Sequence, residues 1–552
     1  MVKDILLANM KKLSFFQKGD SRGMGFSTGS NKVEEVFFFM FIFISLLFCL
    51  ALILRLFQLT IVKGQYYRSL SENNRIREFI IEPIRGSIID RNGNIIVKNS
   101  APNIESKLED IQKNQDRIAS KRIYNSPEAV SSLIGYRQQA DNKDIKQDNC
   151  IYKLKSGDKI GKKGLEKLYD CKLRGQPGRK LIETDARGNF LKTLTIIPAI
   201  SGETLHLSLN LDLQIKAYEL LKDKKGAIIV NNPKTGEILA LASSPTYNPQ
   251  DFEDGNNNLI NSYLTSKDKP IFNRATEGVY PPGSLFKLVT ATAALEEKTI
   301  DEKTEIEDKG SITAGPLTFG NWYFLQYGKT DGFVNIVKAI KRSNDIFFYL
   351  IGEKTGVDKI KKWAETFGLG RLLNSGLDEV EGIIPSIFWK EETLNDRWYT
   401  GDTYNFSIGQ GYVSVTPMQT LVVTSIFANQ GYYCQPYFQK NEKPVCKKNP
   451  ISQKSLDLIR EGMKQACSAG GTGWPLFDFK VNDKNIQTAC KTGTAESHAS
   501  SGLPHAWITA FAPFDKPEIA LTVLVEEGGQ GSDIAGPIAK ELLKTYFEKS
   551  QE

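Results

Sequence analysis

A serine and a lysine three residues apart form the most informative pair in this 552-residue sequence. The spacing Ser-x-x-Lys occurs three times, but Ser156 and Ser266 lie in charged, loop-like surroundings. Ser284 instead follows Tyr280-Pro-Pro-Gly283 and opens an apolar segment whose only charged residue is Lys287. Residues three apart share one face of a helix, so the amine can reach the serine oxygen. Partial burial would lower the pKa of that amine and make it a base for nucleophilic catalysis, whereas the alternative is a helix-capping serine beside an exposed lysine.

A Lys-Thr-Gly sequence further along the chain could bind a carboxylate. Of its three occurrences, one is explained by a hairpin turn and one by a helix end. The third closes the β-type run 486–490, and there a strand edge can present Lys491 and the hydroxyls of Thr492 and Thr494 to one carboxylate. Gly493 would let the backbone of a substrate approach closely.

Between these two motifs lies Ser343-Asn-Asp345, at the start of an apolar helical segment. In this position both side chains could point into a cleft. The alternative is that Ser343 or Asp345 only caps a helix.

The segments that must position these residues predict an antiparallel sheet covered by helices, in the α+β class. Two β-type runs flank an Asn-Pro-Lys-Thr-Gly turn, which is typical of a hairpin. The sequence predicts strands at 226–230, 237–242, 485–490, 506–511 and 519–525, and helices at 284–297, 334–352 and 534–547.

The preceding 210 residues predict a smaller, β-rich unit. We expect a hairpin at 85–97, a solvated loop at 138–150, a short amphipathic helix at 164–169 and a strand at 205–211.

An uncharged run of 19 residues, Val36–Leu54, predicts a membrane-spanning helix. At 1.5 Å per residue it would span about 28 Å, close to the thickness of the hydrocarbon core. A buried core helix rarely remains apolar on every face over this length, and a cleaved signal peptide usually has a shorter apolar region. Basic residues flank both ends equally, so charge does not indicate the orientation.

Composition excludes several other classes. The net charge of +7, from 71 basic and 64 acidic residues, is too mild and dispersed for a nucleic-acid-binding protein. Three scattered histidines do not predict a multi-histidine metal site. Apart from the cysteine in the apolar run, six cysteines could form three disulfides, with Cys434–Cys446 the favoured pair, or remain free thiols. No Cys-x-x-Cys pair is present, so a zinc ribbon is excluded.

The three motifs, in this order, resemble the motif set of β-lactamases and penicillin-binding proteins. Segments 73–77, 83–93 and 164–169 resemble the pedestal domain of class B penicillin-binding proteins. Segments 398–412 and 416–419 are similar to the elongation-type subgroup, penicillin-binding protein 2, and Asp345 also fits that subgroup better than the division-type one.

This resemblance implies a peptidoglycan D,D-transpeptidase that could also act as a D-Ala-D-Ala carboxypeptidase. Ser284 would attack the penultimate D-alanine of a stem peptide, with Lys287 as general base and Ser343 and Asp345 relaying the proton. Lys491 and its neighbours Thr492, Gly493 and Thr494 would hold the terminal carboxylate, backbone N–H groups of Ser284 and Thr494 would form the oxyanion hole, and β-lactams would acylate Ser284.

The resemblance also implies an organisation and partners. We expect a cytoplasmic tail at 1–35, a membrane helix at 36–56, a pedestal at 57–210 and a transpeptidase domain at 211–547 outside the cytoplasmic membrane. A SEDS-family glycosyltransferase and elongation-complex proteins are the expected partners, with no cofactor. Residues 101–132 are too short for the usual head region. Some members bind zinc near this motif, but no histidine or cysteine lies between Ser284 and Ser343, so no metal site is expected.

Three alternatives remain at this stage. The chain could be a division-type transpeptidase, a sensor that β-lactams acylate without turnover, or a scaffold in which Ser284 is incidental.

Overall fold

The computed structural model describes residues 32–103, 117–185, 187–497 and 502–549. These residues form two compact units, one comprising the chain up to Arg77 with Ile182–Lys192, the other Glu78–Leu181 with the chain from Thr193. Most of the expected cytoplasmic tail, and residues 104–116 of the expected short head region, lie outside the described residues.

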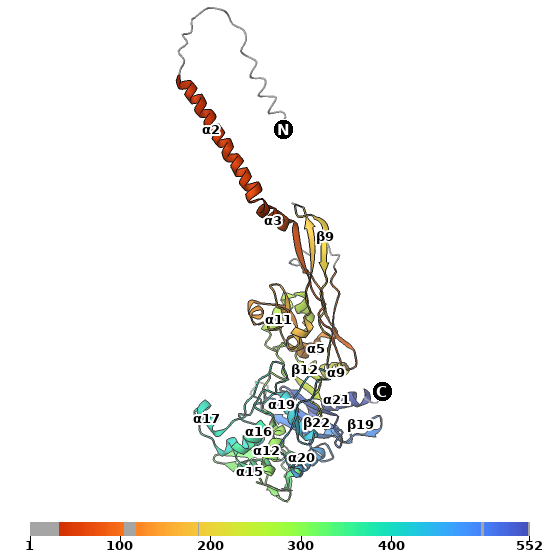
Figure 1. Cartoon of the computed structure of the whole chain (residues 1–552). Helices are drawn as coiled ribbons and strands as arrows, with labels where there is room; N and C mark the ends of the chain where they lie inside the picture. The colour runs from red at the N-terminus through yellow and green to blue at the C-terminus, as the bar shows by residue number, and fades with distance from the viewer. Residues whose placement is uncertain (1–31, 104–116, 186, 498–501, 550–552) are drawn as a thin grey trace, which may run out of the picture. The chain divides into compact units, whose positions relative to one another are not determined.

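The first unit contains the membrane anchor (Figure 1). Helix α2 (Lys32–Phe57) continues through a π-helical turn, η1 (Gln58–Val62), and is followed by α3 (Gly64–Arg75). Its apolar part, Val36–Val62, has a mean hydropathy of 3.1 and is not buried in the protein. In the described part of the chain, this is the one helix that is long and apolar enough to cross a membrane. The predicted single-pass anchor is confirmed.

The second unit begins with two four-stranded sheets, ordered β4-β1-β8-β9 and β10-β2-β3-β5. Their strands are β1 (Ile76–Ile81), β2 (Ile88–Ile89), β3 (Ile95–Asn99), β4 (Arg117–Ile118), β5 (Arg122–Tyr124), β8 (Gly178–Thr184), β9 (Phe190–Ile197) and β10 (Leu205–His206). Strands β2 and β3 pair antiparallel, with Ile88 opposite Val97, so the predicted hairpin is confirmed.

The expected strand at 205–211 is wrong beyond His206. The alternating leucines resemble a strand, but the side chain of Asn210 accepts a hydrogen bond from Leu213 N at 3.1 Å and starts helix α9 (Leu211–Leu221). The expected loop at 138–150 is also partly ordered. It contains the end of β6 (Arg137–Gln139), which pairs with β7 (Lys159–Gly161), and helix α6 (Asn142–Gln147), which Asp141 caps.

The predicted helix at 164–169 is confirmed as α7 (Gly164–Leu168), and it supplies a fully buried carboxylate, Glu166. Arg85 Nε donates to Glu166 Oε2 at 2.7 Å, and Arg122 Nε donates to its Oε1 at 2.8 Å. Burial alone would raise the pKa of Glu166, but Arg122 and Arg85 lower it to about 2. This ion-paired cluster ties α7 to the strands around it.

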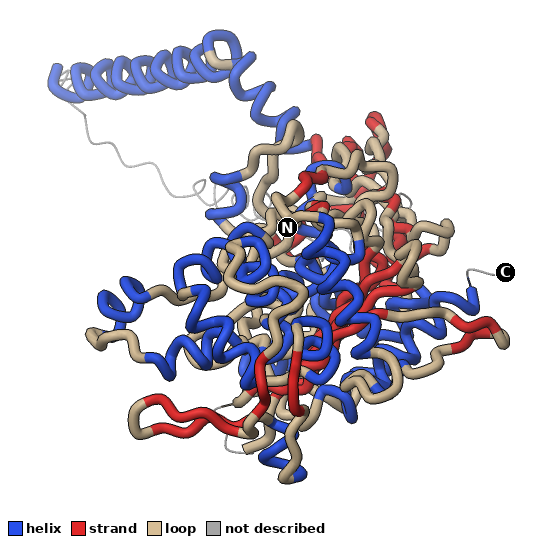
Figure 2. The backbone as a smooth tube through the Cα atoms, turned by 90° about the horizontal axis from the view of Figure 1, so that it is seen from below, coloured by secondary structure: helices blue, strands red, loops and turns tan. Residues whose placement is uncertain are grey.

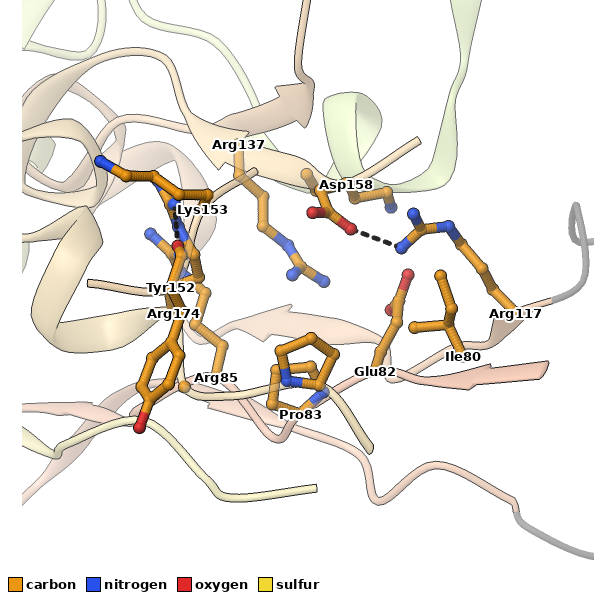
Figure 3. Close-up of a pocket in the computed structure, with 13 residues that line it drawn as sticks. Ile80, Glu82, Pro83, Arg85, Arg117, Arg137, Tyr152, Lys153, Asp158 and Arg174 are labelled. Carbon is orange, nitrogen blue, oxygen red and sulfur yellow. Dashed lines mark hydrogen bonds and ion pairs between the residues drawn. The ribbon is translucent and has the colours of Figure 1, made fainter. Parts of the chain in front are cut away.

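A pocket beside this cluster is lined by further arginines (Figure 3). In it Arg117 Nη1 is ion-paired with Asp158 Oδ1 at 2.7 Å. Arg137 makes a two-pronged pair with Glu253 at 2.7 Å for each bond. Glu253 belongs to α10 (Pro249–Asp254), so the pair joins the strand β6 to a segment over a hundred residues further along the chain.

The larger part of the second unit is built on a five-stranded antiparallel sheet, ordered β12-β11-β23-β22-β21. Its strands are β11 (Gly226–Asn231), β12 (Ile238–Ser244), β21 (Ala489–Ala495), β22 (His505–Ala512) and β23 (Ile519–Val525). Figure 2 shows these strands with helices on both sides. The predicted antiparallel sheet covered by helices is confirmed.

Alternate residues of the strands belong to two separate cores. Ile229 and Leu241 pack with residues of α12 (Lys287–Glu296) and α19 (Pro417–Ala428). Ile228 packs on the other face with residues of α9 and of α21 (Gly536–Lys549), the predicted C-terminal helix. Strands covered on both faces are apolar throughout, which is why β11 and β12 lack a polar alternation.

The remaining elements surround this frame. The helices are α5 (Pro127–Ile134), α8 (Asp170–Leu173), α11 (Asn257–Thr265), η2 (Gly283–Leu285), α13 (Trp322–Tyr327), α14 (Ile336–Arg342), α15 (Asp345–Thr355), α16 (Val357–Thr366), α17 (Ile387–Leu394), α18 (Thr400–Ser407), α20 (Gln453–Ala466), η3 (Trp474–Leu476) and η4 (Gly531–Ala535). The short strands are β13 (Ile306–Asp308), β14 (Ser311–Ala314), β15 (Leu317–Gly320), β16 (Gly332–Val334), β17 (Tyr432–Cys434), β18 (Cys446–Lys448), β19 (Lys480–Val481) and β20 (Lys484–Asn485).

Six cysteines form three disulfides, Cys150–Cys171, Cys434–Cys446 and Cys467–Cys490. The favoured pair Cys434–Cys446 is confirmed, and it joins the paired strands β17 and β18. Cys49 in α2 is a free thiol.

Candidate active site

Ser284 lies in a tight turn that packs against the edge strand β21. The expected helix at 284–297 is instead a 3-10 turn, η2, followed by α12 from Lys287. Gly283 has a φ of +53°, and a Cβ there would lie 3.0 Å from the carbonyl oxygen of Thr494. This left-handed conformation and close approach require glycine before Ser284.

Lys287 is fully buried, which excludes the alternative of a solvent-exposed lysine. Its Nζ donates to the carbonyl oxygen of Ser343 at 2.8 Å, to Ser343 Oγ at 3.3 Å and to Asp345 Oδ1 at 2.6 Å. In the described part of the chain, none of its hydrogen bonds goes to Ser284. The amine is therefore fixed by the middle motif, because the 3-10 turn replaces the regular helical turn that the spacing predicted.

The middle motif occupies a break between two helices. The expected helix at 334–352 is interrupted because Ser343 has a φ of +54°, which ends α14. Asn344 Oδ1 accepts from Phe347 N at 2.9 Å and caps α15, so the capping role falls to neither Ser343 nor Asp345. The side chains of Ser343 and Asp345 line the same cleft as Ser284.

Lys491, Thr492, Gly493 and Thr494 lie inside β21 rather than at the end of a strand. The expected run 485–490 is shifted, since the strand begins at Ala489. Lys491 is fully buried, and its Nζ donates to Ser343 Oγ at 2.8 Å and to its neighbour's carbonyl oxygen at 2.9 Å. The three motifs therefore meet at one hydroxyl.

The free edge of β21 faces the turn that carries Ser284. The carbonyl of Thr494 lies against Gly283 and accepts from Gln410 Nε2 at 3.2 Å. In a β-strand the N–H and C=O of one residue point to the same side, so the N–H of Thr494 also faces this turn. A Cβ on Gly493 would lie 3.1 Å from the carbonyl oxygen of Pro282, which explains the glycine.

Burial and charge lower the pKa of both buried lysines. For Lys287 burial outweighs the opposing effect of Asp345, which raises the pKa. The pKa of Lys491 is well below its usual value, because burial and the charge of Lys287 both lower it. Two amines that share one carboxylate cannot both be readily protonated, so the site favours one neutral amine.

The three motifs open onto a cleft of about 690 Å³. Sequence reasoning missed several of its lining residues. Thr492 Oγ1 donates to Thr472 Oγ1 at 2.8 Å, and Ser532 Oγ donates to the carbonyl oxygen of Thr472 at 2.7 Å. Gln410 and Trp322 complete opposite parts of the lining. The glycines around Thr472 are the one local signal that could have indicated a close-packed loop there.

The other Ser-x-x-Lys and Lys-Thr-Gly sequences have structural roles. Lys159 pairs with Glu253 at 3.1 Å, and Lys234 lies in the turn between β11 and β12. Among the described residues, no group of three or more His, Cys, Asp or Glu side chains is arranged to hold a metal ion.

Two protein-family models match the chain. The model described as penicillin binding protein transpeptidase domain matches residues 226–544, and the one described as Penicillin-binding Protein dimerisation domain matches residues 100–207.

Curated relatives and solved structures agree with these matches. Peptidoglycan D,D-transpeptidase MrdA of Acinetobacter baumannii is 31% identical over 87% of this chain and 82% of its own length, and that of Haemophilus influenzae is 29% identical over 90% and 89%. The penicillin-binding protein PBP2 of Helicobacter pylori, solved in complex with MreC, has a TM-score of 0.72 at 28% identity and covers 86% of this chain and 99% of its own.

Proposed function

Because the chain belongs to the penicillin-binding protein transpeptidase family and is an elongation-type peptidoglycan D,D-transpeptidase, we propose that Ser284 is its acylated nucleophile. The observation that carries this proposal is the buried amine of Lys287, held 2.6 Å from Asp345 and 3.3 Å from Ser343 Oγ at the cleft that Ser284 lines. These contacts bring together the residues of three motifs that lie about 60 and 150 positions apart in the sequence.

In the acylation step, Ser284 Oγ attacks the carbonyl carbon of the penultimate D-alanine of a stem peptide. The hydroxyl proton passes to the neutral amine of Lys287 as the C–O bond forms. The N–H groups of Ser284 and Thr494 stabilise the negative charge on the carbonyl oxygen. When the C–N bond breaks, the departing D-alanine amine takes a proton through the hydroxyl of Ser343.

The terminal carboxylate of the stem peptide binds Lys491, Thr492 and Thr494, with Gly493 leaving room for its backbone. An arriving carboxylate stabilises the ammonium form of Lys491. Since Ser343 Oγ lies 2.8 Å from Lys491 and 3.3 Å from Lys287, a proton can move from Lys287 to Lys491 through this hydroxyl. Substrate binding would then leave Lys287 neutral and ready to act as a base.

In the second half-reaction, the amine of another stem peptide attacks the ester carbonyl of acylated Ser284. Lys287 takes the proton of the amine, the C–O bond to Ser284 breaks, and the cross-link forms. Water in place of the amine gives carboxypeptidase activity. A β-lactam acylates Ser284 by the first half-reaction, and the opened ring stays attached to the enzyme.

The proposed organisation places a cytoplasmic tail at 1–35, the membrane helix at 36–56, a pedestal at 57–210 and the transpeptidase domain at 211–547, outside the cytoplasmic membrane. The dimerisation match at 100–207 and the transpeptidase match at 226–544 support these divisions. Three disulfides support the orientation, because disulfides persist in oxidising compartments and are rare in the cytosol.

The proposed partners are peptidoglycan stem peptides, β-lactams, elongation-complex proteins and a SEDS-family glycosyltransferase. Support comes from the Helicobacter pylori relative solved with MreC, and from a relative in a peptidoglycan synthase complex that couples polymerization and crosslinking, which is 25% identical over 94% of this chain.

The comparisons favour this elongation-type activity over the division-type and sensor alternatives. The direct test supplies the purified full-length enzyme with glycan strands that carry pentapeptide stems, and measures cross-linked product and free D-alanine. We expect both products, and neither with Ser284→Ala. A wild-type enzyme that is acylated by penicillin but releases no D-alanine would be a sensor, and the proposed function would be wrong.

A further inference from the structure

A buried carboxylate behind the active site has no cationic partner. Asp308, at the end of β13, is 3% exposed. Its carboxylate accepts four hydrogen bonds, from Gly310 N at 2.8 Å, Asn321 Nδ2 at 2.8 Å, Asn344 Nδ2 at 2.9 Å and Asp331 N at 2.9 Å. Within the described residues it makes no ion pair, whereas the nearby Asp331 pairs with Arg342 at 2.9 Å. A buried charge held only by neutral donors is costly, so its position calls for an explanation.

One of these hydrogen bonds begins a short path to Lys287. Asn321 donates to Asp308 through Nδ2 and accepts from Asp345 N, through Oδ1, at 3.1 Å. The next residue, Trp322, donates its backbone N–H to Asp345 Oδ2 at 2.9 Å. The opposite oxygen of Asp345 is the one that accepts from Lys287 at 2.6 Å. Asp308 therefore fixes the segment that orients the partner of Lys287.

A second hydrogen bond fixes the turn itself. Asn344 stands between Ser343 and Asp345, and its Nδ2 donates to Asp308 at 2.9 Å and to Asp331 Oδ2 at 3.1 Å. Its Oδ1 caps α15, so every hydrogen-bonding group of this side chain that the contacts describe is held by the protein. The left-handed backbone at Ser343 is thereby locked from behind.

We propose that Asp308 is a positioning residue for acyl transfer, which holds Asp345 and Ser343 in register with Lys287 through Asn321 and Asn344. This inference rests on the proposed function. Asp308 touches no substrate and acts through its neighbours. The role requires an acceptor for several donors at once, which explains why a carboxylate is buried here without a cation.

The test measures the rate of acylation by a fluorescent penicillin, across pH, in the full-length protein. Asp308→Leu keeps the approximate size but accepts no hydrogen bond. Asp308→Asn keeps one carbonyl oxygen, which can still accept from Asn321, Asn344 and Asp331. Asn321→Leu cuts the path to Asp345 while Asp308 retains three donors. Asp301→Leu, which removes an exposed carboxylate seven residues earlier, is the matched control.

We expect Asp308→Leu and Asn321→Leu to slow acylation about tenfold to a hundredfold, Asp308→Asn to stay within about threefold of the wild type, and Asp301→Leu to have no effect. The charged groups that face Lys287 are Asp345 and Lys491. A displaced Asp345 no longer favours the ammonium form, so the acid limb of the pH profile should also move to lower pH in the two slow variants. A purely structural role would lower the yield of folded protein without moving that limb.

The inference is overturned if Asp308→Leu or Asn321→Leu folds and acylates with the rate and pH profile of the wild type. It is also overturned if Asp308→Asn falls as far as Asp308→Leu. Should Asp308→Leu not fold, Asn321→Leu decides the question. If the wild type itself is not acylated at Ser284, the proposed function fails instead, so the two failures are distinguishable.

Discussion

Lys491 Nζ donates a hydrogen bond to Ser343 Oγ at 2.8 Å, and the same oxygen lies 3.3 Å from Lys287 Nζ. Two buried amines therefore share one hydroxyl, with Asp345 as the carboxylate beside them. This arrangement makes the hydroxyl the natural path for a proton between the amines and on to a departing amine. It also separates the roles of the three motifs, which a comparison of their sequences alone does not do.

Removal of the Ser343 hydroxyl should slow acylation about a hundredfold, which is the lower end of the contribution of a proton-transfer group. Ser343→Gly is the appropriate change, because glycine adopts a φ of +54° without strain. The rate is measured by labelling with a fluorescent penicillin. Ser126→Gly is the matched control, since Ser126 is an exposed serine with a φ of +49°. Labelling of Ser343→Gly at the wild-type rate would contradict the shared-hydroxyl mechanism.

Replacement of Lys287 by arginine should lower the acylation rate by about 100- to 10,000-fold. Arginine retains the positive charge but does not lose its proton at any ordinary pH, so it cannot act as the base. Stopped-flow measurement with a chromogenic β-lactam gives the rate. Lys298→Arg, at an exposed turn after α12, should behave as the wild type. If Lys287→Arg retains rapid acylation, Lys287 is not the base.

The pH dependence of acylation should respond to Asp345 with a definite sign. Burial lowers the pKa of Lys287, and Asp345 opposes this by raising it. In Asp345→Asn the opposing effect is lost, so the pKa of Lys287 falls further and more of the amine is neutral at a given pH. The acid limb of the rate profile should therefore shift to lower pH even though the maximal rate drops. An unchanged limb, or a shift to higher pH, would show that this limb does not report Lys287.

Loss of the Cys467–Cys490 disulfide should affect both stability and acylation. Cys490 directly precedes Lys491 on β21, and the disulfide ties this strand to the end of α20. Replacing both cysteines by alanine should lower the free energy of unfolding by about 3 kcal/mol and also slow acylation. The same change at Cys150–Cys171 closes a loop of similar length, and should lower stability but leave acylation intact. Equal acylation in the two double variants would disprove a positioning role for Cys467–Cys490.

Local patterns predicted the parts of the site that depend on neighbours in the sequence. The apolar surroundings of Lys287 correctly indicated burial, and the β-type runs correctly indicated the sheet that holds Lys491. Spacing alone could not predict the left-handed backbone of Ser343, because a serine in an apolar helical segment gives no sign of positive φ. Nor could it predict that Lys287 would bind Ser343 and Asp345 instead of Ser284, since that depends on a 3-10 turn.

Long-range packing determined what the sequence left open. Asn210 ended an apparent strand by capping α9, so a local hydrogen bond prevailed over an alternating pattern. Asp308 reaches Asn344 across 36 positions, and Thr472 reaches Thr492 across 20. Neither contact has a periodic signature. The disulfides other than Cys434–Cys446 likewise depend on the fold, because six cysteines can pair in many ways.

The central claim is that Ser284 is the oxygen that accepts the acyl group. The most direct measurement is peptide mapping by mass spectrometry of the full-length protein after treatment with benzylpenicillin. We predict one penicilloyl adduct, on the peptide that contains Ser284, and no adduct in Ser284→Ala. An adduct on any other residue, or an undiminished adduct in Ser284→Ala, would contradict the assignment.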